Sequence, residues 1–220
     1  MYFRTRMARV RVACRRQSQD RSQQERAIDL SSVSAVIRRR RSIKPARFID
    51  KRIDDATIAE LLENANWAPT HGMTEPWRFF IFTDNARERL GQQLAAIYRA
   101  VTPAEDVKPG KADKLVESCR RSSHVIAIGM KRQESRRIPE IEEIQAVACA
   151  VQNLHLTATA YGLAGYWSSG KTICCDEFRG FLGLSIDDRV LGLFYLGYCT
   201  GTWPAGQRSD ATQKQQWIRA

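Results

Sequence analysis

The chain has 220 residues and a formal net charge of +11, with 43% hydrophobic and 27% charged residues. That length suits one domain that can bury a core without disulfides or metals, and the composition is typical of a folded protein rather than a disordered one. Because no apolar run reaches the ~18 residues of a membrane span and no secretory apolar stretch is present, we expect a cytoplasmic protein without a membrane partner.

The positive charge is concentrated at the N-terminus. Residues 1–41 contain 12 arginines and three acidic residues, so residues 42–220 carry a net charge of only +2. A nucleic-acid-binding protein usually carries basic residues across a folded face, so no nucleic-acid partner is expected. A basic nucleic-acid-binding module in residues 1–41 is an alternative. Residues 1–31 lack apolar periodicity, which predicts a disordered basic arm before a domain over 32–220; a transit peptide or an early start codon are alternative explanations.

Apolar periodicity in the first half of the chain predicts four helices and one buried strand. Serines can cap the first helix, and Asp54 or Asp55 the second. In chain order the elements are a helix from 31–34 to the arginine run at 38–41, a helix from 54 or 55 to Pro69, a strand over 79–83, a helix from 84 or 85, and a short helix over 111–120.

The second half contains two more buried strands around a long helix of small residues, whose stripe includes Val147, Ala150, Val151, Leu154, Ala158 and Tyr161. In chain order the elements are a strand over 125–130, the long helix from about 141 to Gly162, a short strand over 165–167, a helix over 176–182 and a strand over 190–197. Helices and central strands in mixed order indicate one α+β domain.

The six cysteines are not arranged for metal binding or disulfide exchange. None forms a C-x-x-C pair, which argues against zinc and thioredoxin-like chemistry, and no histidine or cationic cluster suggests an activated thiolate. We therefore expect no metal site and no catalytic cysteine.

Residues 165–172 match the phosphate-binding pattern G-x-x-x-x-G-K-[ST]. That motif needs a preceding buried strand, a long following helix and an acidic residue at the end of another strand. Here a helix ends at Gly162, the next helix is short, and neither 125–130 nor 190–197 ends in an acidic residue. Nucleotide binding by a P-loop is therefore only the alternative hypothesis, and Lys171 is expected to be exposed in a turn.

Three segments combine residues suited to a flat ligand with a phosphate. Arg38–Ser42 places guanidinium groups beside a hydroxyl, although a solvated basic run explains that segment equally well by itself. His71 lies in a loop with glycine and proline, where a ligand explains a polar donor better than packing does, whereas Trp77 is expected in the core. In 165–170, glycines allow close approach to a ring and serines can bind its polar edge.

The order and spacing of these segments resemble the nitroreductase family, in its shorter single-domain branch, over about 34–196. The shared features are an R-R-S near the start, a W-A-P-x-H-x-x-x-x-P-W-x-F loop, a small-residue helix, a G-x-W-x-S-G turn and a V-x-G-x-F-Y-L-G strand. The resemblance implies a three-layer α+β fold with a mixed, mostly antiparallel central sheet flanked by helices, built as an intertwined homodimer.

The resemblance also implies which residues bind FMN at the dimer interface. Arg40, Arg41 and Ser42 of one subunit would bind the phosphate side, and Trp67 and His71 would reach the same flavin from the other subunit. The ring edge would be lined by Trp167, Ser168 and Ser169, and Arg208 is a further candidate for the phosphate. Met73 and Glu75 depart from the family pattern, because larger members carry Asn and Gln there.

In such an enzyme the flavin carries the chemistry and no catalytic side chain is required. NAD(P)H would reduce FMN, and a small-molecule acceptor such as a nitroaromatic or a quinone would reoxidise it in a ping-pong mechanism. A flavin-binding protein without turnover, or one with another flavin chemistry, remains an alternative because one fold hosts several reactions.

Overall fold

The computed structural model describes residues 29–219, and the chain divides into two compact units, residues 1–38 and 39–220. In the first, helix α2 (Leu30–Arg39) begins after Asp29, whose carboxylate accepts hydrogen bonds from the backbone N–H groups of Ser31 (3.0 Å) and Ser32 (3.3 Å). The cap is therefore this aspartate and not one of the expected serines. Nearly all of the predicted disordered arm lies outside the described residues.

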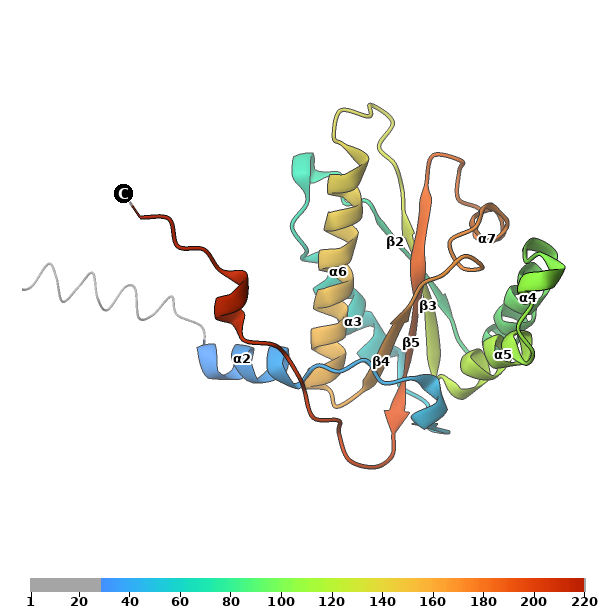
Figure 1. Ribbon diagram of the computed structural model, residues 1–220, viewed down its shortest axis with the longest axis horizontal. Coiled ribbons are helices and arrows are strands. Elements are labelled where there is room, and N and C mark those ends of the chain that lie inside the picture. The colour runs from blue at the N-terminus through green and yellow to red at the C-terminus, as the bar shows by residue number, and fades with distance from the viewer. Residues whose placement is uncertain (1–28, 220) are drawn as a thin grey trace, which may run out of the picture. The chain divides into compact units, whose positions relative to one another are not determined.

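The second unit is built on a five-stranded sheet (Figure 1). Its strands run in the order β1 (Phe48–Ile49), β5 (Arg189–Cys199), β3 (His124–Met130) and β2 (Trp77–Phe82), and β4 (Ala164–Ser168) pairs with β5. Every strand pair is antiparallel. Within residues 29–219, the parallel part of the predicted mixed sheet is limited to one bridge, between Ser42 and Gly165.

Helices cover both faces of the sheet, in three layers (Figure 1). One face carries α3 (Asp55–Asn66) and α6 (Glu140–Ala160), and the other carries α4 (Asn85–Val101), α5 (Lys111–Arg121) and α7 (Asp176–Phe181). The short 3₁₀ helices are η1 (Pro45–Arg47), η2 (His71–Met73), η3 (Ala104–Asp106) and η4 (Ala211–Lys214).

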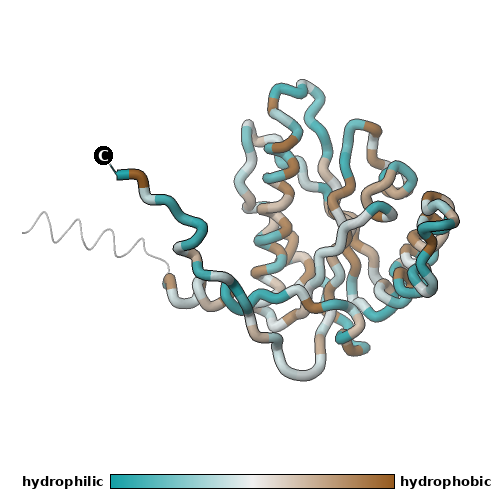
Figure 2. Tube along the Cα trace, in the orientation of Figure 1, coloured by the Kyte–Doolittle hydropathy of each residue, from teal (hydrophilic) through white to brown (hydrophobic). Residues whose placement is uncertain are grey.

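The buried residues of β3 alternate between the two cores, as expected for a strand covered on both faces. Ile126 and Ile128 pack with α3 and α6, whereas Val125 and Ala127 pack with α4, α5 and α7. Figure 2 shows the hydrophobic positions concentrated along the strands and the helix faces around them. The three-layer α+β prediction is therefore confirmed.

The ends of the two helices nearest the candidate site follow local signals in the sequence. The Asp54 side chain caps α3 by accepting a hydrogen bond from Thr57 N–H (2.7 Å). Gly162 (φ 71°) ends α6 with the Schellman pattern of bonds, including one from Leu163 N–H to Ala158 O (2.8 Å). Because Tyr161 is already the C-cap, its side chain is half-exposed rather than inward as predicted.

Candidate functional site

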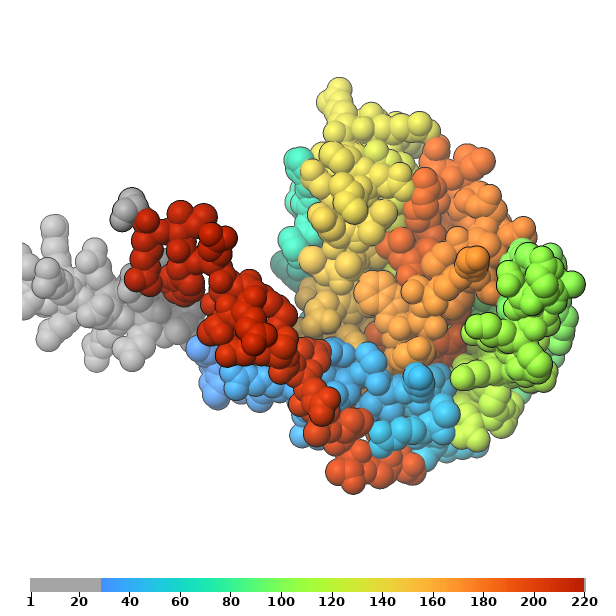
Figure 3. Space-filling model, in the orientation of Figure 1, coloured from blue at the N-terminus to red at the C-terminus, as the bar shows by residue number. Residues whose placement is uncertain are grey.

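Arg40, Arg41 and Ser42 pass directly beside β4. Ser42 bridges Gly165, and the next residue, Ile43, donates its N–H to Gly165 O (2.9 Å). The segment is therefore held against the edge strand by backbone hydrogen bonds. Figure 3 shows this blue segment on the molecular surface next to the red C-terminal residues and below the orange residues of β4.

Arg40 and Arg208 form a basic cluster that combines two segments far apart in the sequence. The pKa of Arg40 is lowered because the guanidinium is partly buried and lies near the positive charges of Arg208 and Arg41. Among the described residues, no carboxylate lies within ion-pair distance of Arg40 or Arg208. Arg40 instead contacts the Ser42 hydroxyl (3.4 Å). Two guanidinium groups without a carboxylate have the charge and donors to bind a phosphate.

Arg41 has a different environment from Arg40. Its Nε donates to Pro204 O (2.9 Å), and one terminal nitrogen donates to Arg40 O (2.7 Å). The bond to Pro204 attaches the C-terminal segment to the start of the domain. The guanidinium of Arg41 thus binds backbone carbonyls, whereas that of Arg40 lies with Arg208 and Ser42.

His155 on α6 holds the backbone of this arginine segment, a role that we did not predict. Its Nε2 donates to Arg41 O (3.0 Å), and its ring packs edge-on against Phe194 at 4.9 Å. The side chain is 5% exposed, and burial followed by the charge of Arg40 lowers the pKa of His155 to about 4. The imidazole is therefore neutral near pH 7. A histidine four residues after Val151, on the inward stripe of the helix, was the available signal.

Gly165 is required by internal packing. A Cβ at this position would lie 2.7 Å from Cζ of Phe194 and 3.0 Å from Cδ2 of His155. Glycine therefore lets the phenylalanine and histidine rings pack beneath β4.

Trp167 lies in a space created by a β-bulge in β5. The register between β3 and β5 shifts there, and Leu191 O accepts a hydrogen bond from Trp167 Nε1 (3.1 Å). Gly192 (φ 145°) follows, and a Cβ there would collide with the indole and lie 2.7 Å from Ser168 O. The indole is 37% exposed, Ser168 is half-buried and Ser169 is exposed. Trp167 and Ser168 follow one another in β4, so their side chains point to opposite faces of the strand.

A cavity of about 500 Å³ opens on the Ser168 side of β4. It is bordered by Lys44, Tyr166, Ser168 and Tyr195, with residues of α5 on the opposite side. Lys44 was missed by the sequence analysis. Its position two residues after Ser42 was the signal, because side chains two apart in an extended segment point to the same side.

His71 lies at the other end of α6 from the arginine segment. His71 Nδ1 contacts Glu142 Oε2 (2.6 Å) at the start of α6, whereas His155 contacts Arg41 thirteen residues later. At 1.5 Å per residue, these two contacts are about 20 Å apart along the helix. One subunit therefore does not bring His71 to Arg40 and Ser42. Trp77, by contrast, is a core residue, as predicted.

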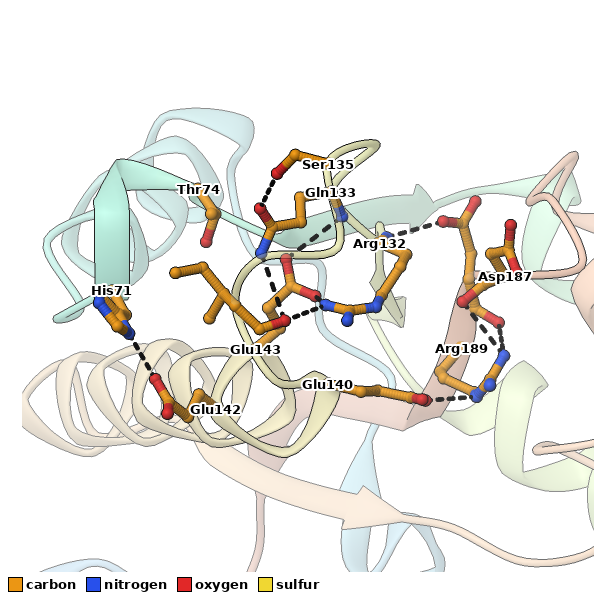
Figure 4. A network of polar contacts seen from close by, with 12 residues as sticks. His71, Thr74, Arg132, Gln133, Ser135, Glu140, Glu142, Glu143, Asp187 and Arg189 are labelled. Carbon is orange, nitrogen blue, oxygen red and sulfur yellow. Dashed lines mark hydrogen bonds and ion pairs between the residues drawn. The ribbon is translucent and has the colours of Figure 1, made fainter.

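The loop that carries His71 has a strained backbone and contacts the start of α6. Met73 (φ 53°) and Glu75 (φ 41°) have left-handed backbone, which costs a non-glycine residue about 1–2 kcal/mol. Figure 4 shows His71 on Glu142, beside a network in which the buried Glu143 binds Arg132 and the N–H of Gln133 (3.3 Å). Backbone strain of this kind is often found at functional sites.

The P-loop-like segment does not form a P-loop. Residues after Gly170 form turns, Lys171 is exposed, and α7 begins only at Asp176 and has six residues. Without a long helix starting at the lysine, the segment lacks the helix N-terminus on which a P-loop depends. This confirms the expected turn.

Neither a metal site nor a membrane-spanning helix is found in residues 29–219. No three potential metal ligands among histidine, cysteine, aspartate and glutamate come together. No helix in this part of the chain combines the length and apolar character needed to cross a bilayer.

Comparison with known proteins decides the family. The model of the nitroreductase family matches residues 37–198. This chain belongs to the nitroreductase family. YfhC of Bacillus subtilis (strain 168), which carries the provisional name of an NAD(P)H nitroreductase, is 29% identical over 164 residues, or 74% of this chain and 82% of that protein. The resemblance seen in the sequence, and with it the expectation of an enzyme of this family, is confirmed.

Solved structures agree with the family. A nitroreductase-like protein from Bacillus cereus superposes with a TM-score of 0.74 at 28% identity, covering 88% of this chain and all (100%) of that one. The structure of a provisional nitroreductase from Desulfovibrio desulfuricans, in complex with FMN, has a TM-score of 0.64 at 24% identity and covers 86% of this chain and 98% of that one. This second similarity supports the fold.

Proposed function

We propose that this nitroreductase-family protein binds FMN between two copies of the chain and oxidises NAD(P)H. The observation that carries the proposal is the cluster of Arg40, Arg208 and Ser42, which has two guanidinium groups, a hydroxyl and no carboxylate partner among the described residues. Burial, followed by repulsion from Arg208 and Arg41, lowers the pKa of Arg40, and a phosphate dianion would offset that repulsion. The donors present therefore fit the phosphate of FMN.

The other predicted contacts fit the rest of the cofactor. Trp167 is held in place by its bond to Leu191 O (3.1 Å), and Ser168 and Ser169 beside it offer hydroxyl and backbone donors to the polar edge of a ring. Lys44 lies beside Ser168 on the 500 Å³ cavity and would favour negative charge on a bound ring. We assign the ring edge to Trp167, Ser168 and Ser169, and the phosphate to Arg40, Ser42 and Arg208.

A second copy of the chain would supply Trp67 and His71. His71 is about 20 Å along α6 from the arginine segment of its own subunit, and Trp67 is 78% exposed and Met73 76% exposed. Large apolar side chains exposed together favour an interface, and an isologous pair would bring each such loop to the other subunit's flavin. We therefore propose a homodimer with two equivalent sites.

The chemistry that FMN supplies when bound is two-electron transfer from NAD(P)H to an acceptor such as a nitroaromatic or a quinone. The side chains described here bind and orient, and no protein nucleophile is needed. Because donor and acceptor would use one site in turn, we expect ping-pong steady-state kinetics.

The proposal is tested by FMN titration of the purified protein, followed by absorbance and flavin fluorescence. We expect a yellow dimer that bleaches anaerobically with NADH or NADPH. Arg40→Gln and Arg208→Gln should each weaken FMN binding roughly tenfold or more, because each removes a charge-assisted hydrogen bond. Arg99→Gln, at an exposed position of α4, is the matched control. A protein that stays colourless and monomeric in excess FMN would overturn the proposal.

A further inference from the structure

The segment that resembles a P-loop lines a second cavity, of about 690 Å³. Gly170, Lys171 and Thr172 form one wall, and Lys108 and Lys111 belong to the opposite one. Figure 3 shows the green helices of this wall beside the orange residues that follow β4. The cavity therefore lies between α5 and the turn after β4.

The charge of this cavity suits an anion. Three lysines from two separate segments line it together with Asp106, and in the described part of the chain none of the three is in an ion pair. Lys111 is the first residue of α5, where the helix dipole adds positive potential. Lysine ammonium groups, hydroxyls and backbone N–H groups together are typical phosphate ligands.

The loop before α5 is fixed rather than loosely placed. Lys108 donates its N–H to the Tyr98 hydroxyl (2.8 Å), and Tyr98 itself is buried in α4. Apolar residues complete the walls, among them Val101, Pro103 and Ile173. A ligand with phosphate and uncharged sugar or ring parts would match both kinds of surface.

The position of the cavity connects it to the proposed flavin site. It shares Lys111, Leu115 and Ser168 with the 500 Å³ cavity, and Ser168 is one of the residues assigned to the ring edge. We propose that the lysine-lined cavity between α5 and residues 168–173 binds a phosphate group of the nicotinamide dinucleotide that reduces the flavin. This proposal rests on the proposed function and extends it to recognition of the donor.

Two phosphates of the donor could occupy the cavity, and the two sources are distinguishable. The pyrophosphate is common to NADH and NADPH, whereas the 2′-phosphate of the adenosine is present only in NADPH. A cavity that binds the pyrophosphate therefore affects both donors, and one that binds the 2′-phosphate affects NADPH alone.

The test uses the FMN-loaded protein and the variants Lys171→Gln and Lys108→Gln, with Lys131→Gln as the matched control. Lys131 is an exposed lysine that lines neither cavity. We would measure KM for NADH and NADPH with menadione as acceptor, and the Kd of ADP and of 2′-AMP by calorimetry. Loss of one exposed charge-assisted contact should raise the affected KM and Kd by roughly 5- to 20-fold, less at high salt. The Kd of FMN and the KM for menadione should stay within about twofold.

The outcomes separate this proposal from the proposed function. A rise for NADPH and 2′-AMP alone assigns the 2′-phosphate, and a rise for both donors and ADP assigns the pyrophosphate. Values equal to those of Lys131→Gln, in an enzyme that still binds FMN and oxidises NAD(P)H, would overturn the donor site and leave the proposed function intact. A rise only for an anionic acceptor such as nitrobenzoate would also overturn it.

Discussion

Replacing His155 tests how the arginine segment is positioned. In His155→Leu the side chain keeps a similar volume against Phe194, but Arg41 O loses the donor that now lies 3.0 Å away. Removing the donor from this partly buried carbonyl costs about 1–3 kcal/mol. For a domain of this size, that loss lowers Tm by roughly 2–12 °C. Because the freed backbone carries Arg40 and Ser42, we also expect FMN to bind roughly tenfold more weakly.

The matched variant is His155→Gln, whose amide nitrogen can donate to the same carbonyl. We expect it to restore most of the stability and most of the FMN affinity lost in His155→Leu. Thermal unfolding of the apoprotein reports the packing contribution, and FMN titration by fluorescence quenching reports the positioning. The two readouts separate a general loss of stability from a displaced phosphate site.

Two results would refute this reasoning. If His155→Leu binds FMN as tightly as the unmodified protein, the hydrogen bond to Arg41 does not position the site. If His155→Gln behaves like His155→Leu in both assays, the imidazole contributes through its ring contacts alone and not through its donor.

Three other predictions concern the same framework. The pKa of His155 is about 4 in the folded protein and about 6.5 in an unfolded chain, so the unfolded state binds more protons between these two pH values. The free energy of unfolding should therefore fall by up to about 3 kcal/mol as the pH drops from 6.5 to 4. Urea denaturation of His155→Gln should show a flatter dependence of the free energy of unfolding on pH. An equal slope in both proteins would contradict this assignment. Gly192→Ala should lower the free energy of unfolding, measured by urea denaturation, by about 3 kcal/mol, because a Cβ there meets Trp167. Gly180→Ala is the control: a Cβ there has nothing within 4 Å, so this variant should be neutral or slightly stabilising. Equal effects of the two substitutions would count against the role of the bulge. Glu143→Gln should cost about 3 kcal/mol because it leaves the charge of Arg132 unpaired in a buried place, while the exposed Glu142→Gln should cost under about 1 kcal/mol by the same measurement. Similar losses in the two glutamate variants would be inconsistent with that difference in burial.

The residue pattern was sufficient to predict the elements, because helix caps and strand alternation are local properties. Asp54 and Gly162 mark helix ends by hydrogen bonds within a few residues, and β3 is a continuous apolar run because both of its faces are covered. The family resemblance, confirmed by the comparisons, depended on the order of motifs along the chain and not on contacts between them.

Contacts between distant segments could not be predicted in this way. Arg208 reaches Arg40, and His155 reaches Arg41, only because the C-terminal segment and α6 both contact residues 39–41. Likewise, the bulge before Gly192 makes room for Trp167, and packing against Phe194 requires glycine at 165. A sequence pattern records which residues prefer a helix or a strand, but a site of this kind depends on distances across the fold. Those distances arise from packing between layers, which no local preference specifies.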